Sequence, residues 1–268
     1  MTSSELSNLK NKEILVTGGC GFIGSEIVKQ LSLIGANVTI IDNLSSGKEK
    51  YIQGLSNVKL ITADLLDDDA VKSAVKDKEY VINNAALPFI PDSYYLPKKF
   101  FDVNVNATIS LALSVIKEKK VKRFVHISSS EIYGTAKYVP MDENHHTTPQ
   151  STYAVSKLAG ERVIFTMHKE HNLPAVIIRP FNSFGPNITQ PYIIPEIIRQ
   201  IEKSDVIKLG NLNAKRDLTY VTDTARGIIL SLVKEGVVGE VINIGSQRSY
   251  SIKDLVSLIS EIMGKKVS

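Results

Sequence analysis

The sequence predicts a doubly wound α/β fold, in which a parallel sheet carries helices on both faces. Short runs rich in β-branched and apolar residues alternate with longer segments of helical period over residues 1–180. The chain has 268 residues, 43% hydrophobic and 22% charged, as in ordinary globular proteins of one or two domains. Its 32 basic and 28 acidic residues leave a small, dispersed excess of positive charge, so we expect no nucleic-acid partner.

The predicted strands are nearly continuous in apolar character, as parallel strands buried on both faces should be. They cover residues 13–17, 37–41, 58–62, 80–83, 123–127 and 175–178, and helices are expected near 23–34, 67–76, 98–118 and 152–171. Right-handed crossovers between these strands imply a Rossmann-type domain over residues 1–180. Residues 1–11 are polar, so we expect a short tail rather than a secretion signal.

The regular alternation of apolar runs and helical segments ends at Pro180, where four prolines occur within sixteen residues. Helices are expected near 193–203, 222–234 and 252–263, with an apolar run at 206–209 and a strand at 240–244. We interpret residues 181–268 as a smaller substrate-binding cap, part of which packs back on the first domain.

Composition also limits the location of the protein and its metal chemistry. No apolar run approaches the ~18 residues that span a bilayer, so we expect no membrane partner. The single cysteine, Cys20, cannot form an internal disulfide, which favours the cytoplasm. No carboxylate or cysteine has ligand-like spacing to His145, His146, His168 or His171, so no metal site is predicted.

A glycine-rich turn follows the first predicted strand. Gly18, Gly21 and Gly24 lie between this strand and a helix, where glycines let the backbone approach a pyrophosphate at the helix N-terminus. Asp42 ends the second strand, where a carboxylate hydrogen-bonds an adenosine ribose and disfavours the additional phosphate of NADP. The sequence therefore predicts NAD as the cofactor.

A second motif indicates proton transfer. Tyr153 and Lys157 are one helical turn apart, so a lysine ammonium is placed to lower the high pKa of a tyrosine hydroxyl. Ser129 follows the fifth strand, at the edge of a parallel sheet where ligands bind. We expect Tyr153 to act as the base, with the Ser129 hydroxyl holding the substrate oxygen.

These motifs resemble those of the extended short-chain dehydrogenase/reductases, specifically the NAD-dependent nucleotide-sugar epimerase/dehydratase family. The resemblance runs through residues 17–24, 42–47, 64–65, 104–108, 129–134, 153–157, 179–186 and 216–223. It implies a nucleotide-diphosphate sugar as substrate and a homodimer in which the helices near 98–118 and 152–171 pair as a four-helix bundle.

The resemblance also implies roles for individual residues. Cofactor-binding positions are Gly18, Gly21, Phe22, Ile23, Gly24, Asp42, Asn43, Ser46, Asp64, Leu65, Ala85, Ala86, Asn104, Tyr153 and Lys157. Asp64 and Leu65 are expected to flank the adenine, and Asn104 to help place the nicotinamide half. Ser130, Asn182 and Arg216 are expected to contact the substrate, Arg216 through its phosphates.

Two features depart from the family pattern. The usual His-x-Ala-Ala appears here as Asn83-Asn84-Ala85-Ala86. Members of the family usually continue for several dozen residues beyond the helix that ends near Met263. We therefore expect either a shortened form of the protein or a more open substrate site.

The overall reaction depends on the step after oxidation at the sugar C4. Glu131 stands where the family's 4,6-dehydratases carry a glutamate base, and the sequence therefore favours a 4,6-dehydratase with catalytic Ser129, Glu131, Tyr153 and Lys157. The alternatives are a 4-epimerase, then a nucleotide-uronate decarboxylase, although residues 87–93 offer no arginine for a carboxylate. A non-catalytic dinucleotide-binding protein is the alternative of a different class, but it has no use for the Ser129, Tyr153 and Lys157 set.

Overall fold

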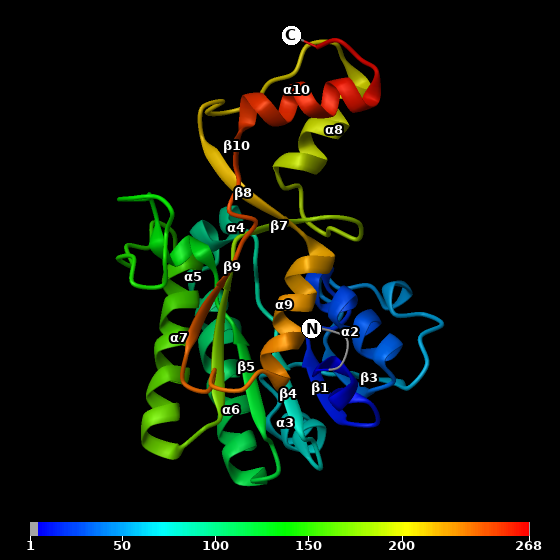
Figure 1. Ribbon diagram of the computed structural model, residues 1–268, viewed down its shortest axis with the longest axis vertical. Helices are drawn as coiled ribbons and strands as arrows, with labels where there is room; N and C mark the ends of the chain where they lie inside the picture. The colour runs from blue at the N-terminus through cyan, green and yellow to red at the C-terminus, as the bar shows by residue number, and fades with distance from the viewer. Residues whose placement is uncertain (1–4, 268) are drawn as a thin grey trace.

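A computed structural model describes residues 5–267 of the chain, and its main body is a seven-stranded parallel sheet (Figure 1). The strand order is β3-β2-β1-β4-β5-β6-β9, so the chain reverses direction across the sheet between β1 and β4. The strands are β1 (Glu13–Thr17), β2 (Asn37–Asp42), β3 (Val58–Thr62), β4 (Tyr80–Asn83), β5 (Arg123–Ile127), β6 (Ala175–Pro180) and β9 (Val241–Ile244). The predicted fold class is confirmed.

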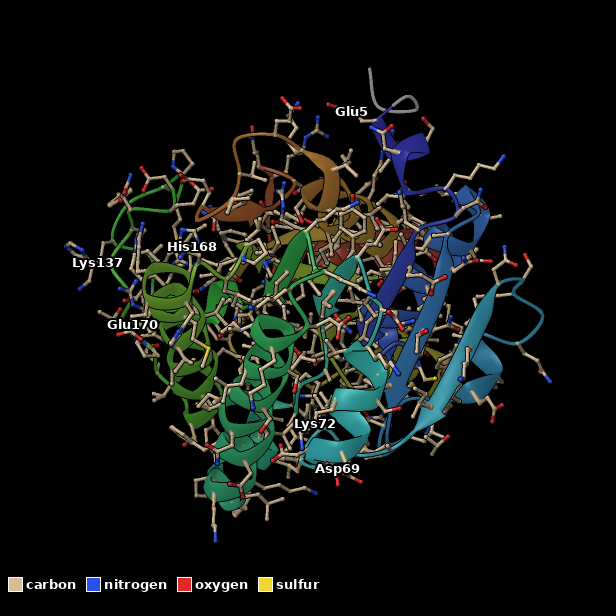
Figure 2. All side chains as sticks on the ribbon, turned by 90° about the horizontal axis from the view of Figure 1, so that it is seen from below. Glu5, Asp69, Lys72, Lys137, His168 and Glu170 are labelled. Atoms are coloured by element: carbon tan, nitrogen blue, oxygen red, sulfur yellow. The ribbon has the colours of Figure 1, made fainter. Side chains whose placement is uncertain are left out.

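Helices cover both faces of this sheet because each strand presents apolar side chains on both sides. One buried cluster joins the sheet to α2 (Phe22–Ile34) and α9 (Val221–Val233). A second cluster joins the opposite face to α3 (Asp68–Val75), α6 (Ala107–Glu118) and α7 (Thr152–His171). Figure 2 shows these three helices side by side, with Asp69 and Lys72 of α3 paired at the surface at 2.9 Å.

The helix predicted near residues 98–118 is interrupted. It consists of α5 (Pro97–Phe101), a π-helical turn η3 (Asp102–Asn106) and α6, and it is preceded by the short α4 (Ile90–Tyr95). A π turn inserts an additional residue into the helix and often marks a functional site. Here it accompanies the buried Asn104, whose side chain bonds the backbone of Leu87.

The stretch Pro97–Glu118 is also long and apolar enough, by length and composition alone, to cross a membrane. In the folded chain it lies between α3 and α7 and contributes Leu111, Ala112 and Val115 to the core beneath the sheet. Core helices of globular domains share this composition, so the packing accounts for the apolar character of the helix.

The chain beyond residue 180 divides between two bodies. A three-stranded sheet in the order β10-β8-β7 and the helices α8 and α10 form a separate upper region with its own apolar cluster (Figure 1). Its elements are β7 (Asn182–Phe184), α8 (Ile193–Lys203), β8 (Lys215–Tyr220), β10 (Ser249–Ser251) and α10 (Ile252–Met263). By contrast, α9 packs on α2, and β9 pairs with β6 at the edge of the main sheet.

Three short helical turns complete the described chain: η1 (Ser7–Leu9), η2 (Glu49–Tyr51) and η4 (Ser130–Tyr133). Leu9 is completely buried in the core around β1 and α2. The predicted polar tail therefore does not extend to Leu9, because this side chain packs with the sheet. Residues 1–4 of that tail lie outside the described residues.

Candidate active site

The turn between β1 and α2 is built so closely that only glycine fits at two positions. Gly18 has a φ of +66°, and a Cβ there would lie 2.8 Å from the Cα of Ala85. At Gly24, in the first turn of α2, a Cβ would lie 2.0 Å from the carbonyl oxygen of Gly18. The turn therefore brings the backbone against both the helix N-terminus and the loop after β4, leaving room for a pyrophosphate.

We expect Gly24→Ala to weaken NADH binding by at least about tenfold, because the added methyl group must displace the turn that receives the pyrophosphate. Titration of nicotinamide fluorescence measures this affinity. Gly210→Ala is the matched control, since a Cβ at Gly210 meets open space. Unchanged NADH affinity in the Gly24 variant would contradict the assignment of this turn.

Carboxylates at the ends of β2 and β3 shape the adjacent part of the cleft. The two oxygens of Asp42 accept hydrogen bonds from the backbone N–H groups of Cys20 at 2.9 Å and Leu44 at 2.8 Å. Each carboxylate oxygen has a further lone pair for a ribose hydroxyl. Asn43 donates to Asp64 at 2.8 Å, which joins the two strand ends.

Cys20 is completely buried beside this carboxylate. Burial, followed by the charges of Asp42 and Glu49, raises the pKa of its thiol to about 12. A thiol that stays protonated is a poor nucleophile, so Cys20 serves as a small packing residue in the turn.

The Thr17 hydroxyl fixes the loop that follows β4. It donates to Asn83 at 3.0 Å and accepts from the backbone N–H groups of Asn84 and Ala85 at 3.1 and 3.0 Å. The Asn83 amide also contacts Thr108 and His126, each at 3.1 Å. The asparagine that replaces the family's usual histidine thus joins a buried polar network under the cleft.

These elements enclose a cavity of about 340 Å³. Eleven of the fifteen predicted cofactor residues line it: Gly18, Gly21, Phe22, Ile23, Asp42, Asn43, Ser46, Asp64, Leu65, Ala85 and Ala86. Residues that the sequence did not single out also line it, among them Leu87, Pro88, Lys99, Asp102, Thr189 and Tyr192. Thr189 and Tyr192 come from the upper region, so the cavity lies between the two bodies.

Asn104 lies beneath this cavity rather than on its wall. Its side chain accepts from the N–H of Leu87 at 2.9 Å and donates to the Leu87 carbonyl at 3.3 Å and to Ser156 at 2.9 Å. It therefore connects the loop after β4 to α7. The predicted influence of Asn104 on the nicotinamide half would act through this loop.

The proton-transfer residues meet where β5 ends and α7 begins. Ser151 caps α7 by accepting from the N–H of Ala154 at 3.1 Å, which sets the start of the helix just before Tyr153. The Tyr153 side chain is hydrogen-bonded to Ser129, and its ring contacts Phe100 edge to face at 6.4 Å. The buried Lys157 donates to the carbonyl oxygen of Ile127 at 2.5 Å, next to the end of β5.

The prediction that Lys157 lowers the pKa of Tyr153 is wrong for the chain without bound ligands. Burial raises the pKa of Tyr153 to about 12, the hydrogen bond from Ser129 opposes this rise, and the charge of Glu131 adds to it. Burial also lowers the pKa of Lys157 to about 8, with Glu161 acting in the opposite direction. Desolvation is the largest cause of both shifts, and the expected effect of the Lys157 charge is not among the causes of the Tyr153 shift.

The predicted substrate residues occupy two places. Ser130 begins the turn η4 directly after Ser129, so it lies beside the catalytic set. Asn182 and Arg216 lie on the neighbouring strands β7 and β8 of the upper sheet, and neither lines the cavity. Arg216 is exposed, and its guanidinium donates to the Lys215 carbonyl at 2.9 Å. The carboxylate of the adjacent Asp217 accepts hydrogen bonds from Ser246 and Gln247.

The chain is similar to known proteins over most of its length. The profile of the NAD dependent epimerase/dehydratase family matches residues 14–245. The chain belongs to this family. As an extended short-chain dehydrogenase/reductase, it is an NAD-dependent enzyme, and the cradle at Gly18 and Gly24 fits the pyrophosphate of that cofactor.

Similar proteins within the family carry out different reactions. A UDP-N-acetylglucosamine 4-epimerase from Methanobrevibacter ruminantium, solved with UDP-N-acetylmuramic acid, is 35% identical with a TM-score of 0.89, over 96% of this chain and 84% of that one. The dTDP-glucose 4,6-dehydratase of Streptomyces venezuelae, solved with NAD, is 27% identical with a TM-score of 0.88, over 95% and 82%. A UDP-N-acetyl-alpha-D-glucosaminuronate decarboxylase of Bacillus cytotoxicus is 31% identical over 94% and 80%.

Proposed function

We propose that the protein is a nucleotide-sugar 4,6-dehydratase. The observation that carries this proposal is the position of Glu131, whose backbone N–H donates to the Ser129 hydroxyl at 3.1 Å and whose charge raises the pKa of both Tyr153 and Tyr192. A carboxylate that acts on both hydroxyls lies close to the reacting centre, where a dehydratase needs a second base.

The reaction would start at the C4 hydroxyl of the sugar. Tyr153 takes the hydroxyl proton while Ser129 holds the oxygen by a hydrogen bond. The chemistry that NAD supplies when bound is the uptake and return of a hydride. Lys157, whose ammonium lies next to the end of β5, provides positive charge near the base.

Glu131 would carry the step that distinguishes dehydration. The new C4 ketone acidifies the C5 proton, which Glu131 would remove. The proton would then pass from Glu131 to the C6 hydroxyl, which leaves as water. Bound NAD would supply the hydride that C6 needs, and C5 would take up a proton in place of the one that Tyr153 accepted, so the net change is the loss of one water. Ser130, adjacent to both catalytic residues, would hydrogen-bond the sugar near the leaving group.

Mass measurement of products formed in heavy water tests the proposal. UDP-, GDP-, CDP- and dTDP-sugars are offered, and the expected product has lost one water and gained one deuterium at C5. We expect Glu131→Gln to slow this elimination by about 10²- to 10⁴-fold. Glu170→Gln is the control, because Glu170 lies at the exposed end of α7 (Figure 2). Unimpaired dehydration by the Glu131 variant would contradict the role of this carboxylate.

The second candidate is a nucleotide-sugar 4-epimerase. It is favoured by the epimerase from Methanobrevibacter ruminantium, which is more similar in sequence to this chain than the Streptomyces dehydratase is. An epimerase needs no base at C5, so its product would keep the substrate mass and contain no deuterium. That outcome would mean that Glu131 has a structural role and does not act as a base.

The assembly and location of the protein are also part of the proposal. Phe101, Leu113 and Val155 on α5, α6 and α7 leave between 36% and 40% of their surface exposed. These apolar side chains support a homodimer in which α6 and α7 pair with their counterparts. The single, buried cysteine supports a cytoplasmic location, where no disulfide is needed.

A further inference from the structure

Tyr192 connects the upper region to the cavity beside the glycine turn and the loop after β4. It immediately precedes α8, yet its side chain lines the same cavity as Gly18 and Ala85. Its ring meets that of Phe89, from the loop after β4, edge to face at 6.3 Å and 68°. The contact joins the two bodies across the cleft, so the position of Tyr192 is fixed relative to the main sheet.

The surroundings of the Tyr192 hydroxyl define its chemistry. Burial, together with the charges of Tyr153 and Glu131, raises the pKa of this hydroxyl, so it stays protonated and able to donate a hydrogen bond. Within residues 5–267 the structure provides no hydrogen-bond partner for it. The Tyr192 hydroxyl is thus a half-buried donor without a protein partner, on a residue that lines the cavity and lies near enough to Tyr153 and Glu131 to feel their charges, so it is suited to a ligand oxygen.

We propose that Tyr192 is a sugar-recognition residue, whose hydroxyl donates a hydrogen bond to an oxygen of the hexose other than the one that Tyr153 deprotonates. The inference rests on the proposed function, since it takes the ligand to be a nucleotide sugar. Tyr153 and Glu131 approach the sugar from the main sheet, whereas Tyr192 approaches it from the upper region. The sugar would thereby be held between the two bodies, and the enzyme would distinguish a nucleotide sugar from the free nucleotide.

The test measures binding as well as turnover in Tyr192→Phe. The probes are UDP-N-acetylglucosamine and dTDP-glucose, each compared with UDP or dTDP alone by calorimetric titration of the NAD-loaded protein. Loss of one neutral hydrogen bond predicts about tenfold weaker binding of the nucleotide sugar, with the affinity for the nucleoside diphosphate unchanged. The ratio of these two affinities is the decisive quantity, because a general disturbance of the cleft lowers both.

Tyr220→Phe is the matched control. Tyr220 is another tyrosine of the upper region with an edge-to-face partner, Phe184 at 5.3 Å, but it does not line the cavity. This control is expected to leave both affinities within twofold of the original protein.

Three outcomes would overturn the inference. The first is an unchanged affinity ratio in Tyr192→Phe, and the second is an equal loss for sugar and nucleotide, which would place the contact on the nucleotide. The third is an original protein that binds neither nucleotide sugar more tightly than the free nucleotide. Failure of the proposed function is recognised separately: the affinity ratio then changes as expected, but no water is lost from any nucleotide sugar.

Discussion

Replacing Tyr153 with phenylalanine is expected to lower kcat by about 10²- to 10⁴-fold and to leave NADH binding intact. The substitution removes only the hydroxyl that is hydrogen-bonded to Ser129, and the ring keeps its edge-to-face contact with Phe100. Turnover is measured with the nucleotide sugar that the original protein converts, and NADH binding by nicotinamide fluorescence.

The same variant separates an enzyme from a protein that only binds the dinucleotide. A binding protein would respond to NADH as before and would have no turnover to lose. Tyr95→Phe is the control, because Tyr95 is 83% exposed and lies outside the cavity. Retention of more than a tenth of the original kcat by the Tyr153 variant would rule out Tyr153 as the principal base.

The main sheet was predictable from sequence because its strands are short, continuous apolar runs. Five of the six predicted strands up to residue 180 start and end within one residue of their observed bounds, and the sixth, at 175–178, extends to Pro180. The strands of the upper sheet have no such signal. β8 begins with Lys215-Arg216-Asp217, and its polar side chains are tolerated because the upper sheet has solvent beside it.

Local sequence placed the parts of the site that depend on neighbouring residues. The glycine turn lies within one strand-turn-helix unit, Asp42 ends one strand, and Tyr153 and Lys157 lie on one helix, so each of these motifs is readable from local sequence. Tyr192 and Thr189 could not be found in this way, because they reach the cavity only through the folding of the upper region over the main sheet. The pKa of Tyr153 could not be predicted from sequence either, because it depends on how completely the folded chain excludes water from the hydroxyl.

A buried ion pair holds the catalytic helix against the sheet. Glu161, one turn after Lys157 on α7, is fully buried and receives two hydrogen bonds from Arg179 on β6, at 3.0 and 2.5 Å. Arg179 also donates to the Tyr133 hydroxyl at 2.7 Å and to the Glu143 carbonyl at 3.1 Å. One guanidinium thus joins α7, β6 and the segment that follows Ser129.

Arg179→Met is expected to lower the free energy of unfolding by about 3–5 kcal/mol, because it leaves the Glu161 carboxylate buried without its partner. Denaturant unfolding measures the change, and Arg179→Met combined with Glu161→Met is expected to recover part of it, since no uncompensated charge remains. The control is Arg199→Met, which breaks a fork of the same geometry with Glu196 at the surface of α8. Solvent already screens that exposed pair, so its loss should cost less than about 1 kcal/mol. Equal effects of the two single substitutions would mean that water reaches Glu161, and α7 would then have to be held to the sheet by its apolar contacts alone.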